Sequence, residues 1–325
     1  MKRILLPLLA GMLALAPLES VWGISREQDL VRDVTNLFKA PTVLPPNNAL
    51  RPNFDGTRNG APILEPFQRD EGPDEASPAE KVSIGYYPWV VALIENQKTP
   101  QEGYICAGVV IAPNWALTAA HCTYNWMRRW PVDSEAYVLT GTEALASPGP
   151  RFAVTKIVPH PDYDPRRLVN DLALVRFDAK GADAGPPLQL DGPPIHDQVG
   201  EIAQIVGWGV SNTKLLARRQ LESLQMIQVG VRSDGVCFSP VNYPQLKGKG
   251  VFCARSLLQY HDTCYRFGGA PIVMLDAKGE RYLAGLVSWP AACPPDVRKP
   301  NAYLDVQAYL PWIKATIRAN TKAAR

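Results

Sequence analysis

The sequence has no cysteine before Cys106, no apolar run long enough to span a bilayer, and little net charge. Its 34 basic residues nearly balance its 31 acidic residues, which leaves a formal charge of +3. A balance so close to neutral does not favour nucleic acid as the main partner. We therefore expect neither a nucleic-acid partner nor a membrane span.

The six cysteines include no CxxC pair and are spread through the chain. This pattern disfavours a metal site and favours disulfides, for which an even number of cysteines is suited. His196 and His261 have no metal-like partners in the sequence. The sequence therefore predicts no metal and no cofactor.

The N-terminus carries an export pattern. Lys2 and Arg3 precede the apolar stretch Ile4–Leu15, which at about a dozen residues suits the core of a signal peptide. Small residues near Gly23 suit a cleavage site. We predict a signal peptide over residues 1–23 and a mature protein in the periplasm or the extracellular medium, where disulfides persist. The alternative is an uncleaved anchor.

Residues 24–80 form a distinct leader with eight prolines and no cysteine. Because proline favours extended chain, we interpret most of 40–80 as a linker or pro-segment. A short helix is predicted ahead of it from apolar residues that share one helical face: Leu30, Val31, Val34, Leu37 and Phe38. This helix either docks on the main domain or a partner, or it is marginal and has no role.

Residues 81–325 contain short apolar runs separated by turn-forming residues, which is typical of antiparallel barrels or sandwiches. We therefore expect an all-β domain. The predicted strands include Trp89–Ile94, Gly108–Ile111, Ala136–Leu139, Leu172–Phe177, Ile202–Val206, Leu224–Val229, Ile272–Leu275 and Tyr282–Val287. One helix is predicted at the end, from Val306 to about Ala319.

The most informative stretch runs from Gly108 to Cys122 and reads GVVIAPNWALTAAHC. It resembles the histidine motif of the chymotrypsin/trypsin-like serine proteases, peptidase family S1. Further motifs follow in family order: Tyr86–Leu93, His160-Pro161, Asn170–Leu174, Gly207–Gly209, Val287–Trp289 and Pro311–Ile313. The resemblance covers about residues 86 to 320 and implies two six-stranded antiparallel barrels with a C-terminal helix.

The resemblance also implies how the cysteines pair. The expected disulfides are Cys106–Cys122, Cys237–Cys253 and Cys264–Cys293. Each would close a loop of about 15 to 30 residues, which stabilises the fold by about 3 kcal/mol on the loop-entropy model. No cysteine is left over.

By the same resemblance, His121 is the general base, and Asp171 orients it and stabilises its imidazolium form. The nucleophile motif of the family is Cys-x-Gly-Asp-Ser-Gly-Gly-Pro. Residues 264–271 read CYRFGGAP, a string of the same length. Gly268 therefore stands at the position of the serine, and it has no side chain that could form an acyl-enzyme.

Two residues just before Gly268 also differ from the family motif in ways that predict loss of catalysis. Arg266 replaces the glycine whose N–H helps to form the oxyanion hole, and Phe267 replaces the aspartate that binds the new amino terminus after activation. Of the Ile-Val-Gly-Gly-like start of active members, only Ile84-Gly85 remains, and it lies too close to Pro88. The loss of both a terminus and its counter-charge predicts a domain that folds without proteolytic activation.

The residues at the positions of the family's substrate pocket match the family only in part. Asp262 stands where trypsin-like members place the carboxylate that binds Lys or Arg. Asn301 replaces a wall glycine, and Pro290, which follows Ser288 and Trp289, offers no N–H to a substrate backbone. Asp262 is thus either the base of a working pocket or a structural residue hydrogen-bonded by Asn301 or nearby backbone.

Three functions are compatible with this sequence. The favoured one is a pseudoprotease: an exported, non-catalytic binding or regulatory protein with a protein or peptide partner. The second is a peptidase with a substitute nucleophile, such as Ser288 or Thr263, and the third is a structural or assembly component. Whether the cleft around His121 is open or filled by the leader would distinguish the first function from the third.

Overall fold

The computed structural model describes residues 80–123, 136–209, 223–257, 263, 265–288 and 299–322. The predicted signal peptide and almost all of the predicted leader lie outside these residues, so both stay predictions. No helix within the described ranges is long and apolar enough to cross a membrane.

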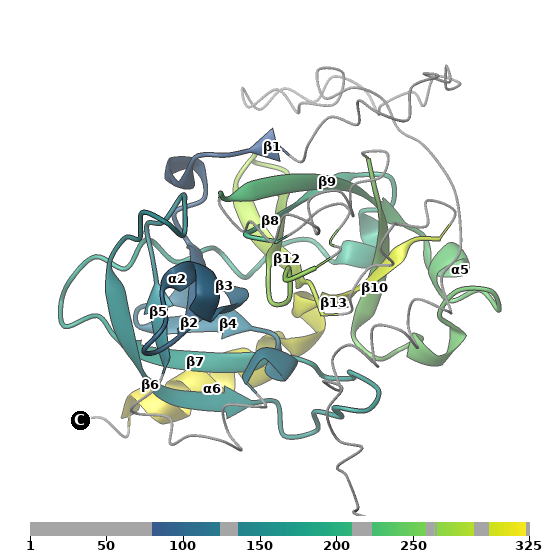
Figure 1. Cartoon of the computed structure of the whole chain (residues 1–325). Helices are drawn as coiled ribbons and strands as arrows, with labels where there is room; N and C mark the ends of the chain where they lie inside the picture. Colours follow the sequence, from purple (N-terminus) through teal and green to yellow (C-terminus); the bar gives the residue numbers. More distant parts are fainter. Residues whose placement is uncertain are drawn as a thin grey trace, which may run out of the picture.

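The first half of the domain is a closed six-stranded barrel (Figure 1). Its strand order is β2-β3-β4-β7-β6-β5, and every pairing is antiparallel. The other strands are buried over most of their length, whereas β6 largely alternates buried and exposed residues because one of its faces meets solvent. The strands are β2 (Val90–Glu95), β3 (Tyr104–Ala112), β4 (Trp115–Thr118), β5 (Ala136–Leu139), β6 (Arg151–Pro159) and β7 (Ala173–Asp178).

The second half is another antiparallel barrel of six strands, in the order β9-β10-β13-β12-β11-β8, closed by pairing of β8 with β9. A short strand, β1 (Glu80–Lys81), adds to the edge of β9. The predicted all-β class and its two barrels are confirmed. The barrel strands are β8 (Ile202–Gly207), β9 (Gln225–Arg232), β10 (Val251–Ser256), β11 (Pro271–Leu275), β12 (Arg281–Leu286) and β13 (Asn301–Asp305).

Helices are short except at the C-terminus. The α-helices described in full are α2 (Pro100–Gly103), α5 (Asp234–Cys237) and α6 (Leu310–Lys322), and residues 120–123 after β4 are helical as well. The 3-10 turns are η2 (Ile84–Tyr86), η3 (Ile195–Asp197), η4 (Pro244–Leu246) and η5 (Val306–Tyr309). The predicted C-terminal helix thus begins as the 3-10 turn η5, where the Asp305 carboxylate accepts the Gln307 N–H. Helix α6 then returns to the first barrel, where Lys156 of β6 donates to Asn320 (Figure 1).

Two of the three expected disulfides are described. Cys106 of β3 is bonded to Cys122, and Cys237 of α5 is bonded to Cys253 of β10. The third expected pair, Cys264–Cys293, lies outside the described residues. The first bond joins β3 to the helical turn after β4, which is the turn that carries His121.

The turn over residues 266–270 links the two barrels. The N–H of Ala107, in β3 of the first barrel, donates to Gly268 O at 2.9 Å, and the N–H of Gly269 donates to Val287 O of the second barrel at 2.8 Å. Gly269 has φ +72°, and a Cβ there would lie 2.2 Å from Thr118 Oγ1 and 2.3 Å from Ala107 O. Only glycine permits so close an approach of backbone to backbone.

We predict that Gly269→Ala destabilises the domain by about 2 kcal/mol more than Gly181→Ala, because it adds a steric clash to the backbone strain. Gly181 is a matched control, since its φ is +80° and a Cβ there meets nothing within 4 Å. Urea denaturation of the two variants measures the difference. Equal losses of stability would show that the close approach does not constrain the fold.

Candidate functional site

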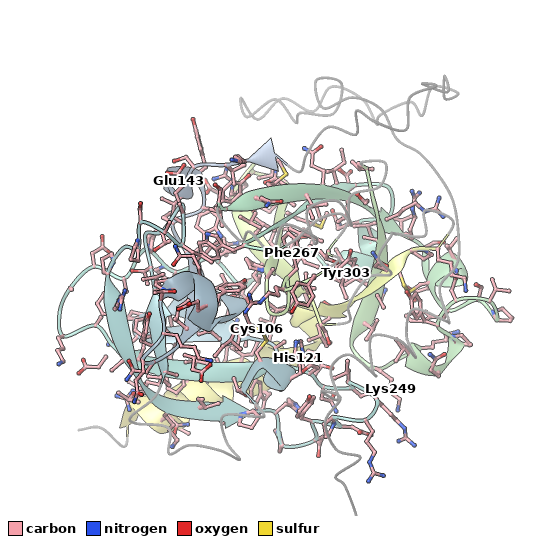
Figure 2. The ribbon with its side chains drawn as sticks, viewed as in Figure 1. Cys106, His121, Glu143, Lys249, Phe267 and Tyr303 are labelled. Carbon is pink, nitrogen blue, oxygen red and sulfur yellow. A yellow bond between two sulfur atoms is a disulfide. The ribbon has the colours of Figure 1, made fainter. Side chains whose placement is uncertain are left out.

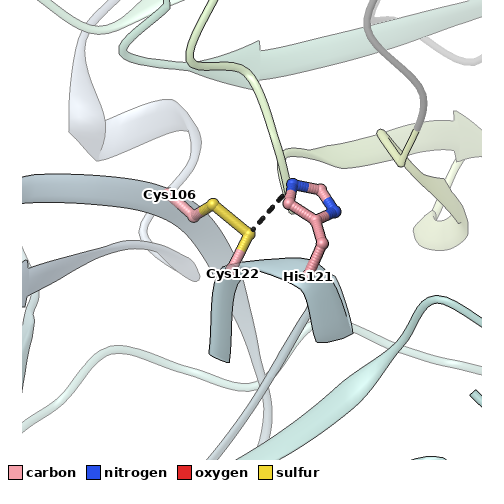
Figure 3. Close-up of side chains that lie close together, drawn as sticks. All are labelled: Cys106, His121 and Cys122. Atoms are coloured by element: carbon pink, nitrogen blue, oxygen red, sulfur yellow. Dashed lines mark hydrogen bonds between the residues drawn. A yellow bond between two sulfur atoms is a disulfide. The ribbon is translucent and has the colours of Figure 1, made fainter. Parts of the chain in front are cut away.

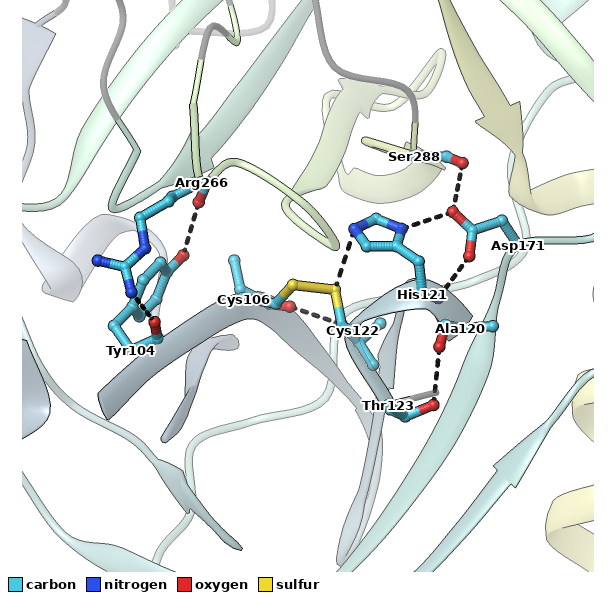
Figure 4. Close-up of a disulfide and its surroundings, with 11 residues drawn as sticks. Tyr104, Cys106, Ala120, His121, Cys122, Thr123, Asp171, Arg266 and Ser288 are labelled. Atoms are coloured by element: carbon cyan, nitrogen blue, oxygen red, sulfur yellow. Dashed lines mark hydrogen bonds and ion pairs between the residues drawn. A yellow bond between two sulfur atoms is a disulfide. The ribbon is translucent and has the colours of Figure 1, made fainter. Parts of the chain in front are cut away.

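The site is centred on His121, on the helical turn after β4, and Asp171, just before β7 (Figure 4). The Asp171 carboxylate is fully buried. It accepts the His121 main-chain N–H at 2.7 Å on Oδ1, and on Oδ2 it meets His121 Nδ1 at 2.7 Å. Because a carboxylate only accepts, Nδ1 carries the proton of this contact, and Nε2 of the neutral ring carries the lone pair.

Ser288 contacts the same Asp171 oxygen, Oδ2, as the His121 ring. Its hydroxyl is buried and donates to Asp171 Oδ2 at 2.5 Å. Ser288 therefore supports the carboxylate from the side remote from His121 Nε2 (Figure 4). Ser288 is thus a buried partner of the carboxylate.

Gly268 lies directly beside the imidazole. A Cβ at this position would lie 2.7 Å from His121 Nε2 and 3.1 Å from Cys106 Sγ. The φ of Gly268 is not in the left-handed region, so its backbone conformation alone does not require glycine. The imidazole and the disulfide thus lie where a side chain at residue 268 would project.

Arg266 occupies a backbone conformation that usually belongs to glycine, with φ +61°. Two reciprocal hydrogen bonds hold it there: its guanidinium donates to Tyr104 O, and the Tyr104 hydroxyl donates to Arg266 O at 3.2 Å. The guanidinium also lies 5.6 Å from the Tyr104 ring centroid and 5.9 Å from that of Tyr265. These contacts offset the strain of the left-handed conformation.

The Tyr104 hydroxyl acts as a neutral donor in this clamp. Burial raises the pKa of Tyr104 above its ordinary value, and the nearby Arg266 charge offsets only part of this rise. The sequence did not point to this partner of Arg266, because the two residues lie 162 positions apart. No local pattern in the sequence carries that information.

Phe267 is an interior side chain, 1% exposed, in the same apolar cluster as Tyr303 (Figure 2). Its ring packs on the backbone of Gly209, where an added Cβ would lie 2.0 Å from a ring carbon. An apolar ring therefore stands where the family resemblance would place a carboxylate.

The residues that precede the first barrel in the chain pair with the second barrel. Val82 N–H donates to Leu224 O at 3.1 Å, and the paired strand β1 precedes it. Ile84 opens the 3-10 turn η2, which Ser83 caps by accepting the Gly85 N–H. Ile84 thus follows directly after the paired residues 80–82 and begins a 3-10 turn.

The pocket residues are only partly described. Asn301 begins β13, is half-buried and pairs with Ala254 of β10. Asp262, Trp289 and Pro290 lie outside the described residues, so their predicted roles stay predictions. Thr263, the other candidate for a substitute nucleophile, is 2% exposed.

Comparisons with known proteins agree with this fold. The family model described as Trypsin matches residues 78–313. Serine protease 1 of Homo sapiens is 28% identical over 262 residues, which cover 80% of this chain and 96% of that protein. Trypsin V-B of Rattus norvegicus is 29% identical over 217 residues, which cover 67% of this chain and 81% of that protein. Coagulation factor XII of Cavia porcellus is 32% identical over 244 residues, or 71% of this chain, which spans only 38% of that longer protein.

We predict that at pH 7 Phe267→Asp lowers the free energy of unfolding by about 3 to 5 kcal/mol more than Phe267→Asn, because it buries a carboxylate without a counter-charge. Phe267→Asn is the matched control, since it loses the same packing but adds no charge. Burial raises the pKa of the new carboxyl group. The difference in unfolding free energy between the two variants should therefore shrink as the pH falls and the group becomes neutral. A difference that is absent at pH 7 would contradict the inferred apolar environment. Chemical denaturation at pH 7 and pH 4 measures it.

Proposed function

The chain belongs to the trypsin family, and we propose that it is an exported, non-catalytic member that acts by binding a protein or peptide partner. Gly268 at the serine position of the family motif is the observation that carries this proposal. A glycine offers no hydroxyl or thiol for an acyl-enzyme, and the remaining His121–Asp171 pair has no nucleophile there to activate.

The geometry beside Gly268 supports the same proposal. In a serine protease, the nucleophile's oxygen lies within hydrogen-bond reach of the histidine. Here Nε2 is so near that even a Cβ on residue 268 would lie 2.7 Å from it. The oxyanion turn is altered as well, because Arg266 replaces the family glycine and is clamped onto Tyr104.

A substitute nucleophile is disfavoured by position. The Ser288 hydroxyl donates to Asp171 and lies on the side of the carboxylate remote from His121 Nε2. Thr263 is buried. A general base must reach the proton that it abstracts, and neither hydroxyl belongs to the turn at residue 268. Peptidase activity through either residue is therefore the weaker candidate.

We propose the following organisation for the chain: a signal peptide over 1–23, a proline-rich acidic leader over 24–80, and a trypsin-like domain over 81–325. The family match begins at residue 78, close to the proposed boundary. Export is supported by the two described disulfides, which persist in oxidising compartments.

We predict that the purified protein is not labelled by a phosphonate probe for serine hydrolases and does not cleave peptides with Lys or Arg at the scissile bond. The comparison is His121→Ala, which should give the same background, because no nucleophile depends on this histidine. Labelling that His121→Ala abolishes would reveal a nucleophile outside the 268 turn, and the peptidase function would replace the proposed one.

We also predict that Gly268→Ser alone does not restore proteolysis. The new Cβ collides with the imidazole, and Arg266 and Phe267 still replace the oxyanion glycine and the activation aspartate. Steady-state hydrolysis of an arginine ester by this variant should stay at the level of the double variant Gly268→Ser/His121→Ala. A rate more than about a hundredfold above that control, which is within the range that general base catalysis supplies, would refute the prediction.

A further inference from the structure

We propose that reduction of the Cys106–Cys122 disulfide converts this site into a zinc site whose ligands are Cys106 Sγ, Cys122 Sγ and His121 Nε2. This proposal does not depend on whether the chain lacks peptidase activity. The three donor atoms lie within 4.8 Å of one another (Figure 3). Among the described residues, no other group of three His, Cys, Asp or Glu side chains is gathered in this way.

The spacing of the donors fits tetrahedral zinc. Zinc binds thiolate at about 2.3 Å and imidazole at about 2.0 Å, so a sulfur and a nitrogen on one tetrahedral ion lie about 3.5 Å apart. Cys122 Sγ lies 3.5 Å from His121 Nε2. This pair therefore needs little rearrangement to share an ion.

The second sulfur can reach the same ion by side-chain rotation. The Cα atoms of Cys106 and Cys122 lie 6.0 Å apart. Two thiolates on one tetrahedral zinc lie about 3.8 Å apart, a separation that two cysteine side chains at this Cα distance can adopt once the bond between them is broken. Both cysteines sit on ordered elements of the first barrel, β3 and the turn after β4.

The surroundings of the histidine match those of zinc-binding histidines. Such histidines commonly donate their other ring N–H to a carboxylate, which fixes the tautomer and raises the basicity of the ligating nitrogen. His121 Nδ1 contacts the buried Asp171 carboxylate at 2.7 Å, and Ser288 holds that carboxylate in turn. Nε2, the ring nitrogen left with the lone pair, lies 3.5 Å from Cys122 Sγ (Figure 3).

The glycine at residue 268 leaves space beside these donors. A side chain there would start 2.7 Å from Nε2 and 3.1 Å from Cys106 Sγ, which is between two of the proposed ligands. Because residue 268 has no Cβ, no side-chain atom of this residue would compete with the proposed ion for that place. The feature that removes the family nucleophile therefore also opens the proposed coordination sphere.

The reductive step requires a dithiol as co-reactant. The dithiol gives two electrons and two protons to the disulfide: its own sulfurs become bonded to each other, and Cys106 and Cys122 become thiols. Zinc binding then releases the two thiol protons to solvent as the thiolates coordinate. The oxidised protein, by contrast, offers no thiolate and should not bind zinc here.

The test uses Co²⁺ as a spectroscopic probe on the full chain, reduced with dithiothreitol and desalted without oxygen. We expect one Co²⁺ per chain with thiolate charge-transfer absorption and the strong visible bands of tetrahedral cobalt, displaced by Zn²⁺. The oxidised protein should show neither. Circular dichroism of the same samples shows whether the reduced domain is folded. Absence of these bands, or unfolding on reduction, would overturn the proposal.

Variants separate this site from other thiols and histidines. Cys106→Ser/Cys122→Ser should abolish the signal, whereas Cys237→Ser/Cys253→Ser should retain it. His121→Gln should weaken binding at least about tenfold, and Asp171→Asn about ten- to a hundredfold, as expected for a carboxylate behind a ligating histidine. Equal binding by the Cys106→Ser/Cys122→Ser variant would refute the assignment.

Two further controls probe the imidazole and the glycine. His196→Gln should leave binding unchanged, although His196 also has a carboxylate on Nδ1, since Asp234 lies 2.7 Å from it. Gly268→Ala should weaken binding at least about tenfold, because its methyl group would enter the coordination space described above. Unchanged affinity in Gly268→Ala would contradict the proposed position of the ion.

Discussion

The close approach of the 266–270 turn to β3 is the constraint on which the rest of the site depends. Gly269 has no side chain, so its backbone can lie against Thr118 and Ala107, and Ala107 N–H can donate to Gly268 O. This contact fixes the turn of the second barrel against the first. The same approach sets Gly268 beside the His121 imidazole and the Cys106–Cys122 disulfide, and thereby determines which chemistry the site can perform.

The buried Asp171 carboxylate depends on His121 as a hydrogen-bond partner. Asp171 is fully buried, and its two oxygens meet the His121 main-chain N–H, the His121 ring and the Ser288 hydroxyl. Removing the imidazole would take away one of these partners and leave a buried charge poorly compensated, which is costly in an interior of low polarity. The pair thus has a structural role that does not require catalysis. In the proposed binding function, this role keeps the surface around His121 in one conformation.

The altered turn is internally consistent as well. Arg266 and Phe267 differ from the family motif in opposite directions, one charged and one apolar, yet each has a partner suited to it. The guanidinium is clamped on Tyr104, and the phenyl ring fills the apolar interior against Gly209. Restoring a single family residue therefore does not restore the family arrangement, because each replacement is packed into its own neighbours.

Much of the fold followed from the sequence alone, because strand patterns and motif spacing are local properties of the chain. The all-β class and the C-terminal helix followed from residue patterns, whereas the two barrels and the Cys106–Cys122 and Cys237–Cys253 disulfides followed from the resemblance to the trypsin-like family. The sequence also shows that Gly268 stands at the position that the family motif gives to serine. What only the tertiary structure decided are contacts between distant segments: the Arg266–Tyr104 clamp, the Ser288 hydroxyl on Asp171, and the distance of His121 Nε2 from two sulfurs and from Gly268. These depend on how two closed barrels pack against each other, and a separation of a few tenths of an ångström in that packing has no counterpart in residue spacing along the chain.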